Sequence, residues 1–442
     1  MTERKDTAVI WNQKYESMGR ESLAQVQLER LQATLNRALR NVTFYRMSFD
    51  RAGVKGDEVR GLEDLARLPF TTKEDLRTSY PYGMFAVPLR DIVRIHSTSG
   101  TTGTPVVVGY TRNDLRTWSE CVARLLAAGG MNEHDVVQVA FTYGLFSGGF
   151  GLHAGAERLG ASVIPASTGG LEKQVRIMKD FKTTALACTP SYAMAIAATV
   201  VDMGVAREDL FLRTGFFGAE PWSEGLRARL ESTLGITALD NYGLTEVLGP
   251  GVAFECERKD GLHVNEDCFI AEIVDPSTLE VLHAGSEGEL VLTTITKEGF
   301  PLVRYRTGDL CAVTAEPCGC GRTLARMSRI RGRIDDMIIM GAVKVFPSQI
   351  EQVLLSVKGL QPHYEIVVDR TAGIDTLEVR VEISEDMPGL DEMKKLEQFR
   401  SRIAHGLAAL LDVPAKVTLV EPRTIARSEG GKSRRVVDKR QI

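Results

Sequence analysis

The sequence lacks several features that would place it in a specialised class of protein. Its 442 residues include only seven cysteines, an odd number spread thinly along the chain, so we expect no disulfide framework. No stretch approaches the ~18 uncharged apolar residues that span a bilayer. Residues 1–20 contain no apolar signal region, and repeats and low-complexity tracts are missing. We therefore expect a cytoplasmic protein with no membrane partner.

Neither sign of charge dominates the chain. The 54 basic and 58 acidic residues leave a net charge of −4, which gives no global bias toward nucleic acid or acidic membranes. The phosphate-loop pattern G-x-x-x-x-G-K-[ST] is also absent. The composition, 43% hydrophobic and 25% charged, is typical of a globular protein. The length exceeds what one hydrophobic core usually organises, so we expect at least two domains.

Strand-like and helix-like patterns alternate from about residue 90 to residue 240. This alternation predicts βαβ units and a largely parallel sheet. The strand-like runs are "DVVQVAF", "ASVIPA", "TALACTP" and "LRTGFFGAE", and the helix-like stretches are 114–128, 171–181 and 191–203. Near the start, "TTKEDLR" predicts a helix that begins after Thr72 with Asp75 completing a capping box.

The second half of the chain changes character twice. Short strands with turn signals predict a β-rich subdomain at about 255–330. Beyond about 335, "TLEVRVEI" alternates as a strand, and 391–411 has a helical stripe that includes Leu410. The fold class is therefore α/β: a large N-terminal domain, residues 1–334, of mixed, largely parallel sheets with helices, and a small, mobile C-terminal α+β domain, residues 335–442.

The stretch "HSTSGTTGTP" at 96–105 contains almost no apolar surface and follows the strand-like "DIVRI". Backbone N–H groups in glycine-rich turns form anion-binding concavities, and hydroxyls add donors that suit phosphate oxygens. A flexible solvent loop would have the same composition. The apolar runs on both sides favour a loop held between two strands.

Four further motifs follow in order: "NYGLTE" (241–246), "YRTGDL" (305–310), "GRIDDMIIMG" (332–341) and "SEGGKSRR" (428–435). Together with "TSGTTGTP" they resemble the adenylate-forming superfamily of acyl-CoA synthetases, from about residue 70 to the C-terminus. The stretches "YGLFSGGFGLHAGAERLGA", "GAEPW", "LTEVLGPGVAFEC" and "DDMIIMGAVKVFPSQIE" are similar to the phenylacetate–CoA ligase-like family within it.

The resemblance implies ATP, Mg²⁺ and coenzyme A as substrates and cofactors, and it assigns residues to the nucleotide. The implied ATP-binding residues are Ser97, Thr98, Ser99, Gly100, Thr101, Thr102, Gly103, Gly218, Ala219, Glu220, Pro221, Asn241, Tyr242, Gly243, Thr245, Asp309 and Arg333. Tyr242 would stack on adenine and Asp309 would accept hydrogen bonds from the ribose hydroxyls. As alternatives, Tyr242 packs in the core and Arg333 forms a surface salt bridge. Thr104 stands where the family often has lysine.

Two charged residues carry the implied chemistry. Glu246 would bind Mg²⁺, a hard cation that prefers carboxylate oxygen. Lys432 would be catalytic, because an ammonium between a carboxylate and the α-phosphate offsets their repulsion. Its alternative is a lysine in a basic tail, and the doubled glycine before it, 430–431, departs from the family. Asp335 would be the hinge about which the C-terminal domain turns.

The resemblance also implies an acid pocket, the group of residues Phe141, Tyr143, Phe146, Leu152, Pro250 and Gly251. The aromatic rings would stack on a planar acid, with Pro250 and Gly251 near its carboxylate. The same aromatics would also suit plain core packing. Leu152 stands where some relatives have a smaller residue, which indicates a short pocket for a compact arylacetate or benzoate.

Cysteines and a histidine in the predicted β-rich subdomain indicate a metal site. Cys256, His263, Cys318 and Cys320 offer three thiolates and one imidazole, the donors of a closed structural zinc site. Cys268 is the rival fourth ligand, and unrelated cysteines remain the alternative. Some phenylacetate–CoA ligase-like proteins carry an analogous cluster.

The expected function is an ATP-dependent ligase that activates an aryl acid such as phenylacetate as acyl-AMP and transfers it to coenzyme A. Two alternatives stay open: an adenylate-forming enzyme with another acid or acceptor, and an inactive zinc-stabilised nucleotide-binding protein. No nucleic-acid partner is expected, and a homodimer is left open.

Overall fold

The structure, a computed structural model, describes residues 9–98, 104–340, 343–357, 360–371, 374–383, 393–411, 413–421, 424–425 and 435–440. These residues form two compact units. The described parts of Met1–Thr189, Ala193–Ala219 and Leu234–Arg329 make the first, and those of Pro190–Tyr192, Glu220–Thr233 and Ile330–Ile442 make the second. None of the helices in the described ranges has both the length and the apolar character needed to cross a bilayer.

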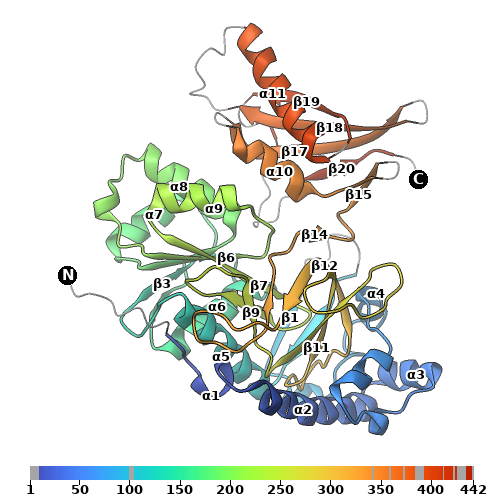
Figure 1. Ribbon diagram of the computed structural model, residues 1–442. Coiled ribbons are helices and arrows are strands. Elements are labelled where there is room, and N and C mark those ends of the chain that lie inside the picture. The colour runs from blue at the N-terminus through green and yellow to red at the C-terminus, as the bar shows by residue number, and fades with distance from the viewer. Residues whose placement is uncertain are drawn as a thin grey trace. The chain divides into compact units, whose positions relative to one another are not determined.

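The first half of the chain alternates helices and strands (Figure 1). The α-helices are α1 (Gln13–Glu16), α2 (Arg20–Asn41), α3 (Thr43–Ala52), α4 (Lys73–Thr78), α5 (Arg112–Ala128), α6 (Gly148–Leu159), α7 (Leu171–Asp180), α8 (Pro190–Asp202) and α9 (Glu224–Leu234). The strands as far as the turn after "NYGL" are β1 (Arg94–Ser97), β2 (Val107–Tyr110), β3 (Val136–Val139), β4 (Ser162–Ile164), β5 (Ala185–Cys188), β6 (Thr214–Gly218) and β7 (Thr237–Leu244). The predicted helices and strands between 90 and 240 are confirmed.

One large sheet organises the first unit. Its strands run in the order β10-β11-β12-β13-β9-β8-β7-β6-β5-β3-β4, and those from β7 to β4 pair in parallel. All four residues of β5 are buried, as expected of a central parallel strand covered on both faces. The predicted α/β class with a largely parallel sheet is confirmed.

The strands of the predicted β-rich subdomain continue this sheet. They are β8 (Gly249–Glu255), β9 (Leu262–Val264), β10 (Phe269–Val274), β11 (Glu287–Thr294), β12 (Tyr305–Thr314) and β13 (Arg326–Met327). Their pairings with one another are antiparallel, and β8 joins them, also antiparallel, to β7 at the edge of the parallel part. The change in sequence character therefore marks a change of strand direction within one sheet.

Helices α5 and α6 approach each other closely next to β8. A Cβ on Gly155 would lie 2.3 Å from a methyl carbon of Val122, and one on Gly151 would lie 2.5 Å from the ring of Trp118. The two helices can therefore pack at this distance only with glycine at these positions. Helix α5 begins with a capping box of Thr111 and Asp114, and α4 with the predicted one of Thr72 and Asp75.

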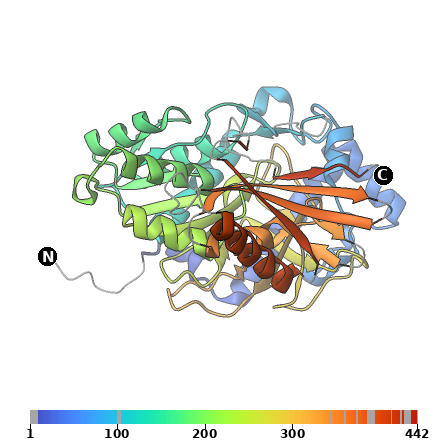
Figure 2. The same ribbon diagram turned by 90° about the horizontal axis from the view of Figure 1, so that it is seen from above.

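The second unit has its own core. Its elements from residue 332 on are β14 (Gly332–Arg333), β15 (Ile338–Met340), β16 (Val343–Val345), α10 (Pro347–Ser356), β17 (Leu360–Thr371), β18 (Ile374–Ile383), α11 (Met393–Leu411), β19 (Ala415–Val420) and β20 (Val436–Asp438). Four strands form a sheet in the order β19-β18-β17-β20, drawn in orange and red in Figures 1 and 2.

Apolar side chains of α10 and α11 pack on this four-stranded sheet. Ile366, Val368, Val379 and Val381 form its buried face, as the alternation in "TLEVRVEI" predicts. The helices contribute the buried residues Ile350, Leu354, Phe399, Ile403, Leu407 and Leu411. The prediction for Leu410 is wrong: this side chain is 38% exposed, because the helical stripe ends on Leu411. The predicted C-terminal α+β fold is confirmed.

Candidate functional site

The first unit gathers predicted nucleotide residues at the ends of β6 and β7. Gly218 ends β6 and pairs in register with Asn241 of β7, whose side-chain amide donates to the carbonyl of Phe217 at 2.8 Å. A Cβ on Gly218 would lie only 2.3 Å from the Asn241 carbonyl oxygen, so this approach requires glycine. Ala219 follows with φ of 70°, a strained value for a residue other than glycine. Two motifs far apart in the sequence thus meet.

Tyr242 and Asp309 meet although their strands are separated in the sheet. The Tyr242 hydroxyl donates to Oδ2 of Asp309 at 2.6 Å, and the Asp309 backbone N–H donates to the Thr307 hydroxyl oxygen at 3.1 Å. The Asp309 side chain is almost fully buried, and burial together with its negative charge raises the pKa of Tyr242 well above its usual value. The tyrosine therefore stays protonated and orients the carboxylate.

Glu246 lies in the four-residue turn 245–248 that joins β7 to β8. Glu246 is buried, whereas an isolated glutamate is usually a solvated surface charge. Its carboxylate lies 3.3 Å from Nζ of Lys73, the first residue of α4. The turn requires close chain approach, because a Cβ on Gly243 would lie 1.9 Å from the Gly249 carbonyl oxygen. Lys73 was not among the predicted site residues, and no motif in "TTKEDLR" pointed to it.

The loop before α6 contacts this turn directly. The hydroxyls of Ser147 and Thr245 are 2.8 Å apart. Pro250, two residues beyond the turn, accepts a hydrogen bond at its carbonyl from the indole N–H of Trp118 at 3.0 Å. Gly251 is buried with φ of 93°. The predicted acid-pocket stretch and the predicted Mg²⁺ stretch are therefore neighbours.

The aromatic residues of the predicted acid pocket lie near one another. The rings of Phe141 and Phe146 are 6.4 Å apart, and those of Tyr143 and Phe150 are 5.2 Å apart. Phe141 is buried, whereas Phe146 is 40% exposed. The Tyr143 hydroxyl lies 3.1 Å from Nδ1 of His153, whose Nε2 is 3.1 Å from Glu157. Leu152 is completely buried.

One carbonyl links the acid-pocket loop to the start of the glycine-rich stretch. The Leu145 carbonyl accepts from the Ser97 backbone N–H and lies 3.0 Å from Nδ1 of His96. Thr98 and Val106, on either side of the glycine-rich stretch, are hydrogen-bonded to each other. The Thr98 backbone N–H donates to the Val106 carbonyl, and the Val106 backbone N–H donates to the Thr98 hydroxyl oxygen, both at 3.0 Å. The predicted residues between them, Ser99, Gly100, Thr101, Thr102 and Gly103, lie outside the described residues, whereas Thr104 is described and exposed.

The remaining predicted residues fall in or beside the second unit. The Glu220 carboxylate accepts from the Ser191 backbone N–H at 2.6 Å, and burial raises its pKa. Pro221 follows it. Arg333 pairs with the exposed Asp335 at 2.8 Å, which is the surface salt bridge named above as its alternative. Lys432 and the glycines at 430–431 lie outside the described residues.

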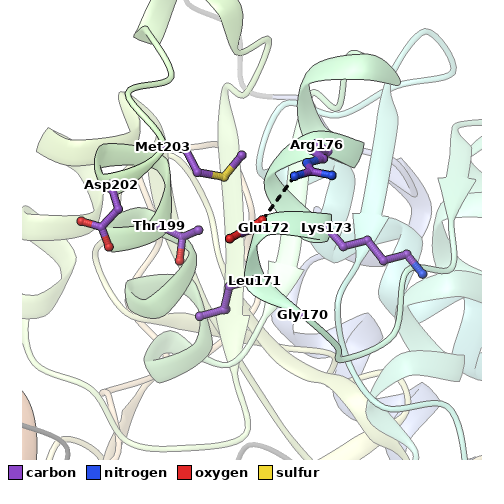
Figure 3. A pocket seen from close by; sticks show the side chains of 8 residues that line it. All are labelled: Gly170, Leu171, Glu172, Lys173, Arg176, Thr199, Asp202 and Met203. Carbon is purple, nitrogen blue, oxygen red and sulfur yellow. Dashed lines mark hydrogen bonds and ion pairs between the residues drawn. The ribbon is translucent and has the colours of Figure 1, made fainter.

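A separate cleft of about 720 Å³ lies between α7 and α8 (Figure 3). Its lining residues are Gly170, Leu171, Glu172, Lys173, Arg176, Thr199, Asp202 and Met203. None of these belongs to the motifs above, and the basic Arg176 is paired with Glu172 at 3.3 Å. We therefore assign it no part in the site.

The four predicted metal ligands converge. The sulfur atoms of Cys256, Cys318 and Cys320 and a ring nitrogen of His263 all lie within 4.8 Å of one another, and all four residues are buried. A Zn–S bond of about 2.3 Å gives tetrahedral ligand separations of roughly 3.8 Å. The Cys256–Cys318 sulfur separation of 3.9 Å fits this value.

The sulfur of Cys320 takes part in several hydrogen bonds within this cluster. A hydrogen bond from Cys256 and a second from His263 lower the pKa of Cys320, and Arg322 donates to its sulfur at 3.6 Å. The rival ligand Cys268 is elsewhere: its sulfur lies 3.7 Å from that of Cys121. The donor set is therefore the Cys₃His group rather than one that includes Cys268.

Comparison with known proteins gives consistent matches. Residues 30–296 match the family model of the AMP-binding enzymes, and residues 342–440 match that of the AMP-binding enzyme C-terminal domain. The phenylacetate-coenzyme A ligase of Thermus thermophilus is 46% identical over 98% of this chain and 100% of its own length. That of Pseudomonas putida is 48% identical over 95% of both chains.

A solved structure is similar over nearly the whole chain. The crystal structure of 2-hydroxyisobutyryl-CoA ligase in its postadenylation state has a TM-score of 0.91 at 31% identity, covering 99% of this chain and 94% of that one. The likeness therefore extends over both compact units.

Proposed function

This chain belongs to the family of AMP-binding enzymes and is an AMP-forming acid–thiol ligase, and on this premise we propose that its acid is phenylacetate or a close aryl carboxylate. A carboxylate oxygen of the acid attacks the α-phosphorus of ATP, and the bond to the pyrophosphate oxygen breaks. The thiol sulfur of coenzyme A then attacks the acyl carbon, its proton is released, and AMP leaves. The relatives at 46–48% identity, named as phenylacetate-coenzyme A ligases, support this acid.

The single observation that carries the proposal is the contact between Ser147 and Thr245. It joins the loop with the aromatic residues to the turn with Glu246, at 2.8 Å between the hydroxyl oxygens. An acid bound against the rings of Phe141 and Phe146 would present its carboxylate toward the residues that hold ATP. The two reactants of the first step would then share one site.

We assign the nucleotide to the residues that the structure groups around β7. Asp309, oriented by Tyr242, would accept from the ribose hydroxyls. Gly218, Ala219, Asn241 and Gly243 would shape the adenine slot. Ser97, Thr98 and residues 99–103 would bind the phosphates. Glu246 would hold Mg²⁺, which supplies positive charge to the phosphates when bound.

Lys73 adds a cation beside Glu246. Thr104 offers no charge where the family often has lysine, and the Lys73 ammonium, 3.3 Å from the Glu246 carboxylate, would supply a cation to the phosphate oxygens instead. Lys432 would offset the repulsion between carboxylate and α-phosphate in the first step. Asp335 would be the hinge that withdraws this lysine before the thiol attacks.

The Cys₃His cluster would hold a structural Zn²⁺. Four buried donors would fill a tetrahedral coordination shell, which would leave no position for a substrate. The metal would hold β8, β9 and the segment of Cys318 together and take no part in the reaction.

The test measures AMP formation with a panel of aryl and aliphatic acids, with and without coenzyme A. We expect phenylacetate to give the highest kcat/KM and product formation to require coenzyme A. A preference for an aliphatic acid, or turnover with another acceptor, would replace the proposed substrates while keeping the adenylation chemistry. Absence of acid-dependent pyrophosphate release would favour the inactive binding protein, and Lys432→Ala should abolish that release.

A further inference from the structure

The turn 245–248 has an unusual arrangement of backbone carbonyls. The Tyr110 hydroxyl lies 2.8 Å from the Leu248 carbonyl oxygen and 3.3 Å from that of Thr245. Nζ of Lys297 donates to the carbonyl oxygens of Val247 at 2.7 Å and Glu246 at 3.2 Å. Two side chains from outside the turn thus reach all four of its carbonyls, which a short turn cannot satisfy by itself.

Burial of Lys297 at this position costs free energy, because its amine must be desolvated. Its side chain is 2% exposed and packs over the rings of Tyr110 and Phe300, with Nζ 4.6 and 5.2 Å from their centres. Burial lowers its pKa to about 7, although Asp114 and Glu246 act in the opposite direction. Methionine would fill the space without the cost of desolvating an amine. The hydrogen bonds to the turn are therefore what lysine adds.

The backbone that carries Lys297 is itself fixed. The N–H groups of Glu298 and Gly299 donate to the two carboxylate oxygens of Asp114, at 2.7 and 2.9 Å. Asp114 also accepts from the Thr111 N–H at the start of α5. The segment that carries Lys297 is therefore held to the start of α5 by two hydrogen bonds.

The same turn carries two predicted functional side chains. Thr245 contacts Ser147, and Glu246 contacts Lys73. Since Lys297 and Tyr110 hold the carbonyls, loss of these hydrogen bonds would let the peptide groups rotate and move the Glu246 carboxylate. We propose that Lys297 is a positioning residue that holds the backbone of Glu246 so that its carboxylate meets the metal–nucleotide complex. The proposal rests on the Mg²⁺ role assigned to Glu246 above.

The experiment uses Lys297→Met in the full-length enzyme. The readout is the Mg²⁺ concentration that gives half-maximal acid-dependent exchange of pyrophosphate into ATP. We expect this concentration to rise about tenfold, because residues that orient a metal ligand typically contribute that much to metal affinity. The KM for the acid should stay as in the wild type. Lys297→Arg, which keeps donors for the carbonyls, should recover part of the loss.

The matched control is Gln27→Met. Gln27 is a buried side chain whose amide donates to the carbonyl oxygens of Glu266 at 2.9 Å and Phe269 at 3.5 Å. Its replacement by methionine therefore also removes hydrogen bonds to two carbonyls. It is expected to lower the melting temperature without changing the Mg²⁺ dependence. If Lys297→Met and Gln27→Met change the Mg²⁺ dependence equally, Lys297 is only structural and the proposal is overturned.

The variant Glu246→Gln distinguishes the positioning role of Lys297 from the Mg²⁺ role of Glu246, on which it rests. An unchanged Mg²⁺ dependence in Glu246→Gln would show that Glu246 does not bind Mg²⁺, whatever the result for Lys297. If Glu246→Gln weakens Mg²⁺ activation, the double variant Glu246→Gln/Lys297→Met tests whether Lys297 acts through Glu246. In that case we expect the double variant to need the same Mg²⁺ concentration for half-maximal exchange as Glu246→Gln alone. Additive losses would overturn the positioning role. Should Lys297→Met not fold, Lys297→Leu, which also lacks a donor, takes its place in the same comparison.

Discussion

At the scale of single residues, the site depends on polar groups whose partners hold them in one protonation state and one orientation. Asp309 is one example: its carboxylate lies 2.6 Å from the Tyr242 hydroxyl. The phenol can donate only while it is protonated, and its raised pKa keeps it so at any physiological pH. A carboxylate fixed in this way can accept hydrogen bonds from a ribose without first reorienting.

Tyr242→Phe should therefore weaken ATP binding. The hydrogen bond to a charged group is worth about 1.5–3 kcal/mol, and the part of it that orients Asp309 for the ribose sets the loss, so we expect the KM for ATP to rise by up to about a hundredfold. Tyr143→Phe is the matched change at the acid pocket and should raise the KM for the acid instead. Steady-state kinetics with each substrate varied in turn measures both. A rise in the KM for the acid in Tyr242→Phe would contradict the assignment.

His96 illustrates a titratable group held neutral. A carbonyl only accepts, so Nδ1 must carry the proton that is donated to Leu145, and Nε2 is buried with no hydrogen-bond partner among the described residues. The rings of Tyr110, Trp118 and Phe150 surround the imidazole at 5.5–5.7 Å. Burial lowers its pKa from 6.5 to about 4, because a charged ring would have to be desolvated.

This shift predicts a pH dependence of stability. Between pH 6.5 and about 4 the unfolded chain binds the proton and the folded chain does not, so the free energy of unfolding falls as the pH falls through this window. His96→Asn keeps a donor but cannot titrate there. Denaturant titrations should show the wild type losing up to about 3 kcal/mol more than the variant across this range. Parallel curves would contradict the buried neutral histidine.

At the scale of elements, the large sheet brings distant segments together at strand ends and turns. Strand β12 supplies Asp309 and β7 supplies Tyr242, with three strands between them in the sheet. The metal cluster belongs to the antiparallel part of the sheet: Cys256 directly follows β8, His263 lies on β9, and Cys318 and Cys320 lie between β12 and β13. The predicted adenine residues Gly218 and Asn241 lie instead on β6 and β7, which pair in parallel.

Cys320→Ser tests the metal cluster. We expect the purified wild type to contain about one Zn²⁺ per chain and the variant to lose it, with a melting temperature lower by roughly 5 °C, because the metal links three segments. Cys268→Ser is the control, since its sulfur contacts Cys121 rather than the cluster. Metal analysis and thermal melts measure both. Loss of zinc in Cys268→Ser and not in Cys320→Ser would reverse the assignment.

At the scale of the whole molecule, the proposed function needs two compact units and a turning point between the two half-reactions. Asp335 is exposed and forms an ion pair with Arg333, two residues before it. Such a pair contributes little to stability, so it would not resist a change in backbone angles.

Asp335→Pro should separate the half-reactions. Proline fixes φ near −65°, so the backbone loses the freedom that a hinge requires. We expect transfer from preformed acyl-AMP to coenzyme A to slow about tenfold or more, while pyrophosphate exchange is retained. Asp335→Ala removes the ion pair but leaves φ free and should behave as the wild type. If the alanine variant is equally slow in the transfer step, the salt bridge and not the hinge is responsible.

Much of this architecture follows from the sequence alone. Period-two and helical patterns determine the α/β class, because burial of one face requires that spacing. The capping box at Thr72 is local and so could be predicted directly, whereas the one at Thr111 came only from the structure. The ordered motifs identify the family, and the Cys₃His donors could be named because thiolates and imidazole are few in this chain.

Only the tertiary structure decided which residues support those motifs. No motif singles out Lys73 or Lys297, and each contacts Glu246 from more than fifty residues away in the chain. The choice of His263 with Cys318 and Cys320 over Cys268, and the exposure of Leu410, also depended on packing. Periodicity and composition are properties of neighbours along the chain. Contacts across a sheet depend on strand order, and no local pattern contains that order.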